Sequence, residues 1–201
     1  MATSSKPGPE ASTRILNAAV RVFAARGYAA TSVQELLRGT GYSKPTLYYH
    51  FGSKAGLFRA ILDFAYDEVF RLMRDSGQGR GEAGERLARA TMAIFTFATT
   101  HQDLTRLVFA SMFAAPGEIP AGVLDAARRR RNTEFLHSIV RQGQEGGELR
   151  QDVDAHDLLN GILGAVSHRV RTHLLEPRGA LDWKTAQLTV QLFMNGARRT
   201  R

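Results

Sequence analysis

The chain has 201 residues, no cysteine and a formal net charge of +8, and hydrophobic residues make up 43% of it. This composition is typical of a globular protein, and no apolar run approaches the roughly 20 residues of a membrane-spanning helix. The lack of cysteine excludes disulfides, thiolate metal ligands and a cysteine nucleophile from this chain. Residues 1–11 lack the apolar segment of a signal peptide, so we expect a flexible arm there, no association with a membrane, and a cytoplasmic protein.

The positive charge is concentrated near the N-terminus. Residues 1–58 contain seven Lys or Arg side chains and two acidic ones, whereas the remaining residues contain twenty basic and seventeen acidic side chains. A basic segment beside a nearly balanced one indicates that the first segment meets a polyanion, of which nucleic acid is the commonest.

Apolar residues recur at helical spacing along the whole chain, and alternating strand patterns are absent, so we predict an all-α fold. The first helix is expected over residues 13–26 and ends at Gly27, a residue that adopts positive φ without strain. Ser32 and Glu35 have the spacing of a capping box. They predict the start of a second helix that runs to about Thr40.

A short third helix is expected over residues 44–50, with Ser43 as its N-cap and Pro45 in its first turn. Two helices joined by a turn of three or four residues that contains a glycine, here Gly41, are typical of a helix-turn-helix, whose second helix enters the major groove of DNA. Only Leu47 is suited to anchor this helix inward. Its other side chains carry hydrogen-bonding groups: Lys44, Thr46, Tyr48, Tyr49 and His50. The alternative is a small exposed helix with incidental polar residues.

A fourth helix is predicted from Ser53 to about Asp75, followed by a loop over residues 76–84 that contains four glycines. The apolar spacing beyond the loop predicts five further helices, and therefore about nine in all. These are expected at 82–100, 102–113, 120–145, 154–176 and 182–199.

The stretch SKPTLYYHFGSKAGLF at residues 43–58, together with ARGYAATSVQEL before it, resembles the DNA-binding head of TetR-type (tetracycline-repressor-like) regulators. The resemblance covers about residues 13–62, and it departs from the usual pattern at Leu37, Thr40 and Tyr42. It implies a helix-turn-helix domain over 12–58. Residues 59–201 would then form a helical regulatory and dimerisation domain.

Carried over by position, the resemblance implies contacts with DNA bases or phosphates, most of them from the third helix. It implies that Tyr49 and His50 contact the DNA backbone, and that Ser32, Gln34 and Lys54 lie close to phosphates. Lys44 suits the O6 and N7 atoms of guanine, and Thr46 suits a thymine methyl group. Tyr48 has two interpretations of equal weight, a DNA contact or a structural residue. The full set of expected DNA-binding residues is Ser32, Gln34, Ser43, Lys44, Pro45, Thr46, Tyr48, Tyr49, His50 and Lys54.

The predicted body offers a soft, aromatic lining for an apolar ligand, because thioethers and aromatic rings adapt to varied shapes. Met92, Phe95, Phe109, Met112 and Phe113 are the candidate lining residues. Asn160 and His168 are candidates for its polar contacts. The competing interpretation is that these residues are ordinary core or interface residues.

The last two helices are expected to form a homodimer, because the resemblance implies a four-helix bundle made by two copies. The candidate interface residues are Leu159, Ile162, Val166, Val170, Leu188, Leu192 and Phe193. Gly161 and Gly164 would allow the helices to approach closely.

Two charged clusters do not alter this assignment. The four arginines of Arg128–Arg131 point in different directions on a helix and are expected to form a solvated face. The acids around His156 (Asp152, Asp154 and Asp157) fit capping of a helix start better than a metal site. We therefore expect no metal and no cofactor.

Two hypotheses remain. The first is a dimeric transcriptional regulator, expected to be a repressor, that binds a palindromic operator in double-stranded DNA and is released by a small, largely apolar effector. The alternative is a helical ligand-binding protein or enzyme with a vestigial DNA-binding head. The sequence contains no catalytic motif, so we expect no enzyme.

Overall fold

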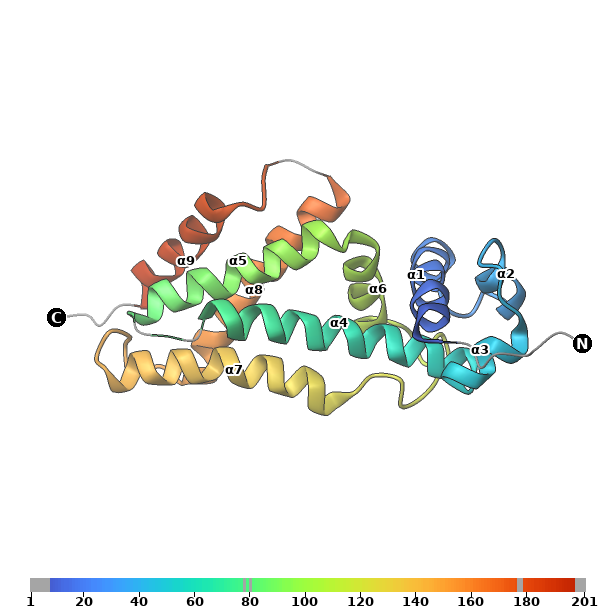
Figure 1. The fold of residues 1–201 in the computed structure, drawn as a ribbon. Coiled ribbons are helices and arrows are strands. Elements are labelled where there is room, and N and C mark those ends of the chain that lie inside the picture. The colour runs from blue at the N-terminus through green and yellow to red at the C-terminus, as the bar shows by residue number, and fades with distance from the viewer. Residues whose placement is uncertain (1–7, 78, 80, 177–178, 198–201) are drawn as a thin grey trace, which may run out of the picture. The chain divides into compact units, whose positions relative to one another are not determined.

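In the computed structural model, residues 8–77, 79, 81–176 and 179–197 are described, and this part of the chain forms nine α-helices and no β-strand (Figure 1). The prediction of an all-α fold is therefore confirmed. The helices are α1 (Pro9–Arg26), α2 (Val33–Leu37), α3 (Lys44–Phe51), α4 (Lys54–Gly77), α5 (Ala83–Thr100), α6 (Gln102–Met112), α7 (Ala126–Glu145), α8 (Ala155–Leu175) and α9 (Trp183–Ala197).

The internal contacts divide the chain into two compact units. The head unit comprises the residues up to Ala65 together with Asp103–Asp125, and the body unit comprises Tyr66–Gln102 together with the residues from Ala126 onward. This division differs in two ways from the expected domain boundary after residue 58. It falls within α4, and nearly all of α6 belongs to the head unit.

Helix α1 begins earlier than its apolar spacing predicted. Pro9 occupies the first turn, where its missing N–H leaves no hydrogen bond unmade. The hydroxyls of Ser12 and Thr13 donate to the carbonyl of Pro9 at 2.8 and 3.2 Å. The last part of the arm expected over 1–11 is therefore helical, and residues 1–7 lie outside the described part of the chain. At the other end, Gly27 has the expected positive φ of 74°.

The core of the head unit is built around three aromatic rings. Phe23 of α1 meets Phe58 of α4 edge-on at 5.1 Å between ring centroids, and Tyr28 lies 5.0 Å from Phe58. A cavity of about 330 Å³ separates these rings from Leu107 and Ser111 of α6. Each fully buried Leu, Ile or Phe side chain here contributes roughly 1.5–3 kcal/mol through removal of apolar surface from water.

Helix α2 ends at Leu37, three residues before the expected end at Thr40. Gly39 has a φ of +76°, which interrupts the helix. The Thr40 hydroxyl then donates to the Leu37 carbonyl at 2.8 Å and accepts from the backbone N–H of Tyr42 at 3.2 Å. Thr40 is thus a buried turn residue that satisfies backbone groups at the end of α2.

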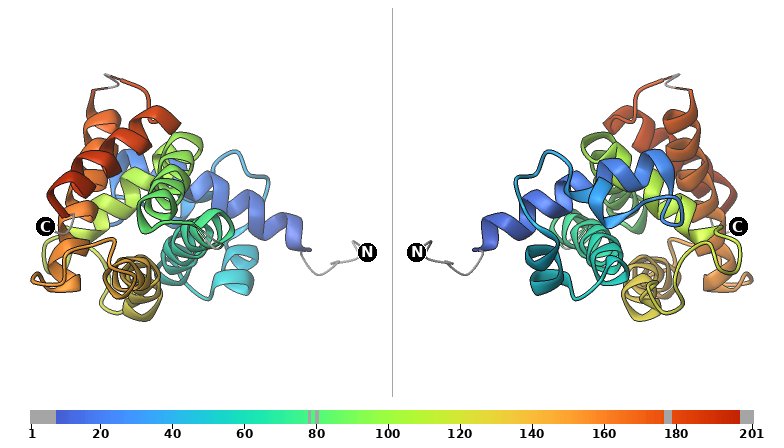
Figure 2. Two further views of the ribbon diagram at one scale, coloured as in Figure 1. Left: turned by 90° about the vertical axis from the view of Figure 1, so that its left-hand side faces the viewer. Right: turned by 90° about the vertical axis from the view of Figure 1, so that its right-hand side faces the viewer.

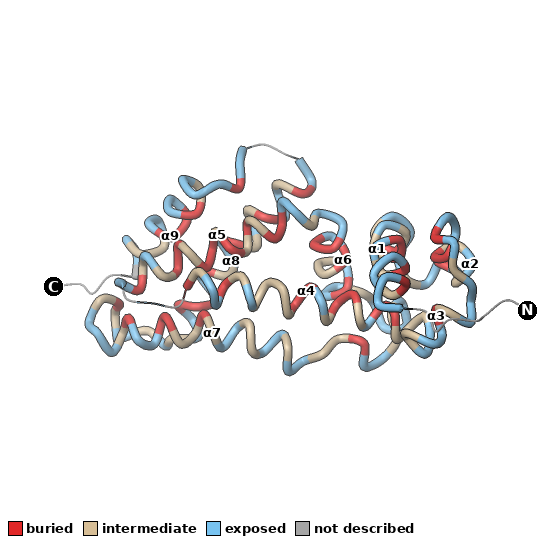
Figure 3. The backbone as a smooth tube through the Cα atoms, in the orientation of Figure 1, coloured by how far each residue is buried: buried red, intermediate tan, exposed pale blue. Residues whose placement is uncertain are grey.

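In the body unit, α5 packs against α7, α8 and α9, and α8 and α9 also pack against each other (Figure 2). Buried positions recur along the whole of α5 (Figure 3). Helix α7 starts at Ala126 instead of the expected residue 120, because Gly122 takes a φ of +73° within a turn. The predicted end of the last helix at residue 199 lies outside the described residues. None of the helices in the described part of the chain has the length and apolar character of a membrane span.

One close approach in the body unit depends on a glycine. A Cβ atom at Gly143 of α7 would lie 2.7 Å from the Cβ of Ala83 and 2.9 Å from Cδ1 of Leu149. No side chain larger than hydrogen fits there without displacing its neighbours. Gly164 of α8 is different, since a Cβ there would meet nothing within 4 Å.

We predict that Gly143→Ala lowers the free energy of unfolding by about 1–3 kcal/mol, the usual cost of overpacking. Gly164→Ala is the matched control and should leave stability unchanged or raise it by up to about 1 kcal/mol, because alanine favours helix. Urea unfolding followed by circular dichroism measures both. Equal stability of the two variants would contradict the packing described for Gly143.

Candidate nucleic-acid interface

Helices α2 and α3 form a helix-turn-helix in the head unit (Figure 1). The connection between them, residues 38–43, is longer than the three or four residues expected, because α2 ends early. Leu47 is the fully buried residue of α3 and anchors it to the head core. The other side chains of α3 are exposed or half-buried.

The outward side of α3 carries most of the predicted DNA-binding residues. Tyr48 and Tyr49 are 46% and 60% exposed, which is unusual for such large rings, and Lys44 and Pro45 are exposed beside them. At the start of the helix, Ser43 makes no side-chain capping bond, and its hydroxyl lies 3.1 Å from that of Thr46. The first backbone N–H groups of α3 therefore lack a side-chain acceptor and are available to an anion.

His50 differs from the two tyrosines that precede it. Its ring is half-buried and meets Tyr49 edge-on at 5.1 Å, and its Nε2 atom is buried without a hydrogen-bond partner among the described residues. This nitrogen does not face outward with Tyr49. The expected contact of His50 with the DNA backbone stays a prediction without support from its orientation.

Lys54, at the start of α4, was expected near a phosphate, but its ammonium is turned into the head unit. Nζ donates to the carbonyls of Tyr28 and Thr31 at 3.0 and 2.7 Å and lies 4.1 Å from the centroid of the Tyr28 ring. Burial lowers the pKa of this amine. The side chain therefore holds the segment that leads into α2. Sequence spacing could not predict these bonds, because Tyr28 and Thr31 lie more than twenty residues before Lys54.

The start of α2 has the predicted capping box. The Ser32 hydroxyl accepts from the Glu35 N–H at 3.2 Å, and the Glu35 carboxylate accepts from the Ser32 N–H at 2.8 Å. Arg26 of α1 also forms an ion pair with Glu35. The Ser32 hydrogen bonds, followed by the Arg26 charge, hold the pKa of Glu35 below its usual range. Gln34 is exposed next to this box.

The structure brings Gln34 of α2 and Lys44 of α3 to the same hollow of about 450 Å³, which Leu37, Arg38 and Tyr42 complete. Arg38 and Tyr42 were not among the predicted DNA-binding residues. Arg38 is an exposed cation directly after α2, a signal that the sequence contained. This surface combines two cations, an amide and the half-buried ring of Tyr42, groups suited to phosphates and base edges.

The candidate ligand-lining residues are divided between the two units. Phe95 is fully buried and Met92 half-buried on α5 of the body unit. Phe109, Met112 and Phe113 belong to the head unit, and the last two are 43% and 78% exposed. Asn160 and His168, the proposed polar contacts, are exposed on α8.

The candidate dimer residues also form two groups. Four of them are buried in the single chain, on the inner face of α8: Leu159, Ile162, Val166 and Val170. Leu188 and Leu192 of α9 are 45% and 61% exposed, and Phe193 is half-buried. A partner can therefore reach α9 residues directly, whereas the α8 residues serve the core of the chain itself.

The two charged clusters have local explanations. Arg128 and Arg131 both form ion pairs with Asp67 of α4, so half of the arginine run is engaged instead of solvated. Asp152 pairs with Arg150 at 2.6 Å, and Asp154 caps α8. No group of three or more His, Asp or Glu side chains suited to a metal occurs in the described part of the chain.

Two parts of the chain match the sequence profiles of known protein families. Residues 15–61 match the sequence profile described as "Bacterial regulatory proteins, tetR family", and residues 80–171 match that of the tetracyclin repressor-like C-terminal domain. The repressor KstR2 of Mycobacterium tuberculosis is 28% identical over 90% of this chain and 87% of its own length. The activator FasR of Mycolicibacterium smegmatis is 32% identical, but that match covers 58% of this chain and 53% of FasR.

The fold of this chain also occurs in solved structures of other proteins. The fatty acid degradation regulator FadR from Bacillus halodurans superposes with a TM-score of 0.82 over 98% of this chain and 100% of its own. At 19% sequence identity, this similarity concerns the fold alone.

The capping box predicts an acid-dependent part of the stability. Because the folded-state pKa of Glu35 is lowered, its contribution is present above the ordinary glutamate pKa of about 4.3 and is lost as the pH falls through the folded-state value. We expect Glu35→Gln to be less stable than the parent chain at pH 7, with a difference that shrinks at acidic pH in urea unfolding. Glu10→Gln, an exposed change on α1, is the control, and an equal pH effect in that variant would contradict the assignment.

Proposed function

Because this chain belongs to the TetR family of bacterial transcriptional regulators, we propose that it is a repressor that binds a palindromic operator as a dimer and is released by a small, largely apolar effector. The observation that carries the DNA contact is the outward face of α3. A helix anchored by one buried leucine presents Lys44, Tyr48 and Tyr49 to solvent within a basic head.

The DNA contacts proposed here follow from position and chemistry. Lys44 and Thr46 lie in the first turn of α3, the part of a recognition helix that reaches base edges. Tyr49 and the free N–H groups at the start of α3 suit phosphates. Gln34 of α2 and Arg38, directly after α2, line the same hollow as Lys44. Lys54 acts indirectly in this proposal, by holding the segment before α2 in place.

TetR-family regulators bind DNA and small-molecule effectors and act as dimers. A repressor outcome is supported by the match to KstR2, which spans most of both chains, whereas the match to the activator FasR spans about half of that protein. An apolar effector is supported by the aromatic and thioether side chains on α5, of which Phe95 and Met92 are the proposed contacts. We place the protein in the bacterial cytoplasm, where the operator is, and assign no catalytic step to it.

The dimer proposed here uses α9 and the outer side of α8. Leu188 and Leu192 give α9 an exposed apolar face, and Trp183 and Leu175 extend it with 44% and 73% exposure. Burial of such side chains against a second copy is favourable, and depletion of charge at the centre is typical of interfaces. Two bound copies would place their recognition helices about 34–36 Å apart, one turn of DNA.

The direct test is selection of bound duplexes from a randomised DNA library with the full chain. We expect a palindromic motif to be enriched, and affinity for it to fall steeply with salt because several phosphates are neutralised. Lys44→Ala should weaken binding to the selected motif by about 1–3 kcal/mol and relax the preference at one base pair in each half-site. Fluorescence anisotropy measures both effects.

Lys184→Ala provides the control, since it removes the same charge from an exposed site in the body unit. It should leave the affinity and the sequence preference unchanged. If no motif is enriched, the operator proposal is wrong. If both lysine variants bind equally well, Lys44 has no direct role.

We predict that Leu192→Arg converts the dimer to a monomer, because a charge would replace an exposed apolar side chain at the proposed interface. Sedimentation equilibrium measures the change. Phe113→Arg is the control, as an equally drastic change at an exposed aromatic residue of the head unit. A dimer retained in Leu192→Arg would remove α9 from the interface.

Val166 is not suited to this test, because its side chain is only 3% exposed and a charge there would disrupt the core of the single chain.

A further inference from the structure

Two histidines of the body unit meet between α7 and α8. His137 lies on α7 and His156 in the first turn of α8, and Nε2 of the former is 2.9 Å from Nδ1 of the latter. Their ring centroids are 4.3 Å apart, and the ring planes are inclined at 80°. His137 is half-buried and His156 is exposed, so the two nitrogens lie near the surface. The folded chain thus brings together two side chains of the type that most often binds transition metals.

The distance between the two nitrogens fits two ligands of one metal ion. A bond between a transition metal and an imidazole nitrogen is roughly 2.0–2.1 Å long. Two such bonds whose nitrogens are 2.9 Å apart enclose an angle of about 90° at the metal. A tetrahedral ion would instead hold the nitrogens about 3.3 Å apart. The geometry therefore favours an ion with right-angled coordination, of which Cu²⁺ and Ni²⁺ are typical.

The positions of the rings distinguish this arrangement from a straight hydrogen bond. In a straight N–H···N bond each imidazole points at the other, which separates the ring centroids by about 5 Å. Two rings that both point at one ion, at a right angle to each other, have centroids about 4.5 Å apart. The observed separation of 4.3 Å is closer to the second value. The two rings therefore converge on a point beside the pair.

The groups near the pair favour a cation. Asp154 caps α8 and accepts from the backbone N–H of His156 at 2.8 Å, which fixes the first turn of the helix. Asp157 follows His156, and Glu134 precedes His137 by one turn of α7; both are exposed. Negative charges at this range attract a cation weakly through solvent. Within the described ranges no third His, Asp or Glu side chain completes a metal cluster, so water would occupy the remaining coordination positions.

The histidine pair lies outside the surface proposed for the dimer. The side of α8 that faces α9 is marked by Gly161, where a Cβ atom would lie 3.5 Å from the ring of Phe193. Gly161 follows His156 by five residues and is therefore about 140° around the helix from it. Leu175, the residue of α8 placed at the dimer interface, is about 100° around the helix from His156. The pair faces α7, which the proposed dimer does not use.

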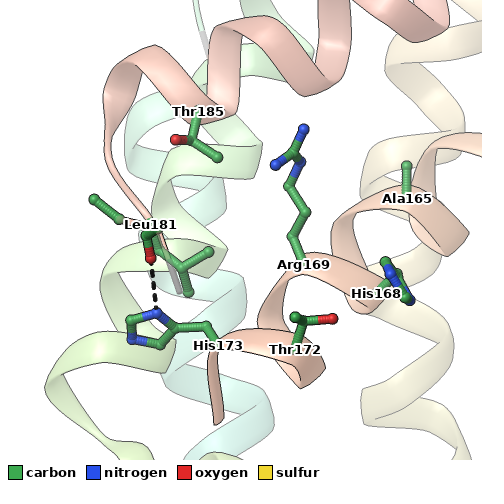
Figure 4. Close-up of a pocket in the computed structure, with 9 residues that line it drawn as sticks. Ala165, His168, Arg169, Thr172, His173, Leu181 and Thr185 are labelled. Atoms are coloured by element: carbon green, nitrogen blue, oxygen red, sulfur yellow. Dashed lines mark hydrogen bonds between the residues drawn. The ribbon is translucent and has the colours of Figure 1, made fainter. Parts of the chain in front are cut away.

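The other two histidines of α8 provide an internal comparison, because each has a neighbour of a different kind (Figure 4). Nδ1 of His173 lies 3.3 Å from the carbonyl oxygen of Gly179. Nδ1 of His168 lies 3.4 Å from the guanidinium of Arg171. Neither of these neighbours is an imidazole, so we expect only weak, single-ligand metal binding there.

We propose that His137 and His156 form a two-histidine site for one divalent transition metal ion, Cu²⁺ or Ni²⁺. Affinities of nitrogen sites rise from Mn²⁺ through Ni²⁺ to Cu²⁺, so the same order is expected here. An ion held by one ligand from each helix links α7 to α8 and stabilises the folded chain, because the unfolded chain does not hold the two rings together. This site is separate from the DNA-binding face and does not depend on the operator proposal.

The first test is calorimetric titration of the full-length protein, without a histidine tag, with copper, nickel and manganese chlorides. We expect one strong site per chain for Cu²⁺, a weaker one for Ni²⁺ and no saturable binding of Mn²⁺. In NMR spectra, substoichiometric Cu²⁺, which is paramagnetic, should broaden the ring signals of His137 and His156 before those of His168 and His173.

His137→Gln and His156→Gln should each weaken Ni²⁺ binding by about ten- to a hundredfold, because the second imidazole acts as an intramolecular ligand in the parent chain. His173→Gln is the matched control, since it removes an imidazole of α8 that has no second ring beside it, and it should leave the affinity unchanged. Ni²⁺ should raise the midpoint of thermal unfolding in the parent chain and in His173→Gln, but not in the other two variants.

Three results would overturn the proposal. Absence of Cu²⁺ and Ni²⁺ binding would show that the two rings share only a hydrogen bond. Equal affinity in the parent chain, His137→Gln and His156→Gln would place the metal elsewhere. Broadening of the His168 and His173 signals at the same Cu²⁺ concentration would indicate unspecific binding to single histidines. This last measurement uses the parent chain and tests the site even if His137→Gln does not fold.

Discussion

The ammonium of Lys54 holds the proposed DNA-binding surface in place, although it does not itself lie at that surface. It bonds two backbone carbonyls of the segment between α1 and α2 and lies over the ring of Tyr28, which packs on Phe58. That segment leads directly into the capping box of α2. The position of α2 is therefore stabilised by an interaction with the start of α4 as well as by packing on α1, and α3 packs in turn on α1 and α2. The partly buried ammonium of Lys54 thus helps to keep in place the helices that carry the cations of the hollow beside α2 and α3, Arg38 and Lys44.

The sequence predicted those features that depend on neighbouring residues. The capping box of Ser32 and Glu35 and the end of α1 at Gly27 involve partners within one helical turn, so spacing alone identified them. Leu47 was identified as the inward anchor because the other side chains of its predicted helix carry polar groups. The fold class followed from apolar periodicity in the same way. For the candidate site, the exposed residues of α3 were predicted as a group, because a helix with one apolar side chain has only one face to bury.

What the sequence could not predict depends on partners far along the chain. Lys54 resembles a phosphate ligand until its bonds to Tyr28 and Thr31 are known, and Arg128 resembles a solvated residue until it pairs with Asp67. Apolar periodicity identifies a buried face but not what covers it. Val166 and Leu192 therefore appeared equivalent, although the first faces the core of its own chain and the second faces solvent.

The head unit is discontinuous in the sequence, and this has a consequence for biosynthesis. Its last part, Asp103–Asp125, is separated from the first by Tyr66–Gln102 of the body unit. On the ribosome, the helix-turn-helix emerges early, but α6 reaches it only after more than thirty further residues have been made. Until then, Phe23 and Phe58 lack the neighbours that α6 supplies across their cavity. The nascent DNA-binding head therefore completes its core during translation of the body, and a gene fragment that ends after α4 would encode a head without that cover.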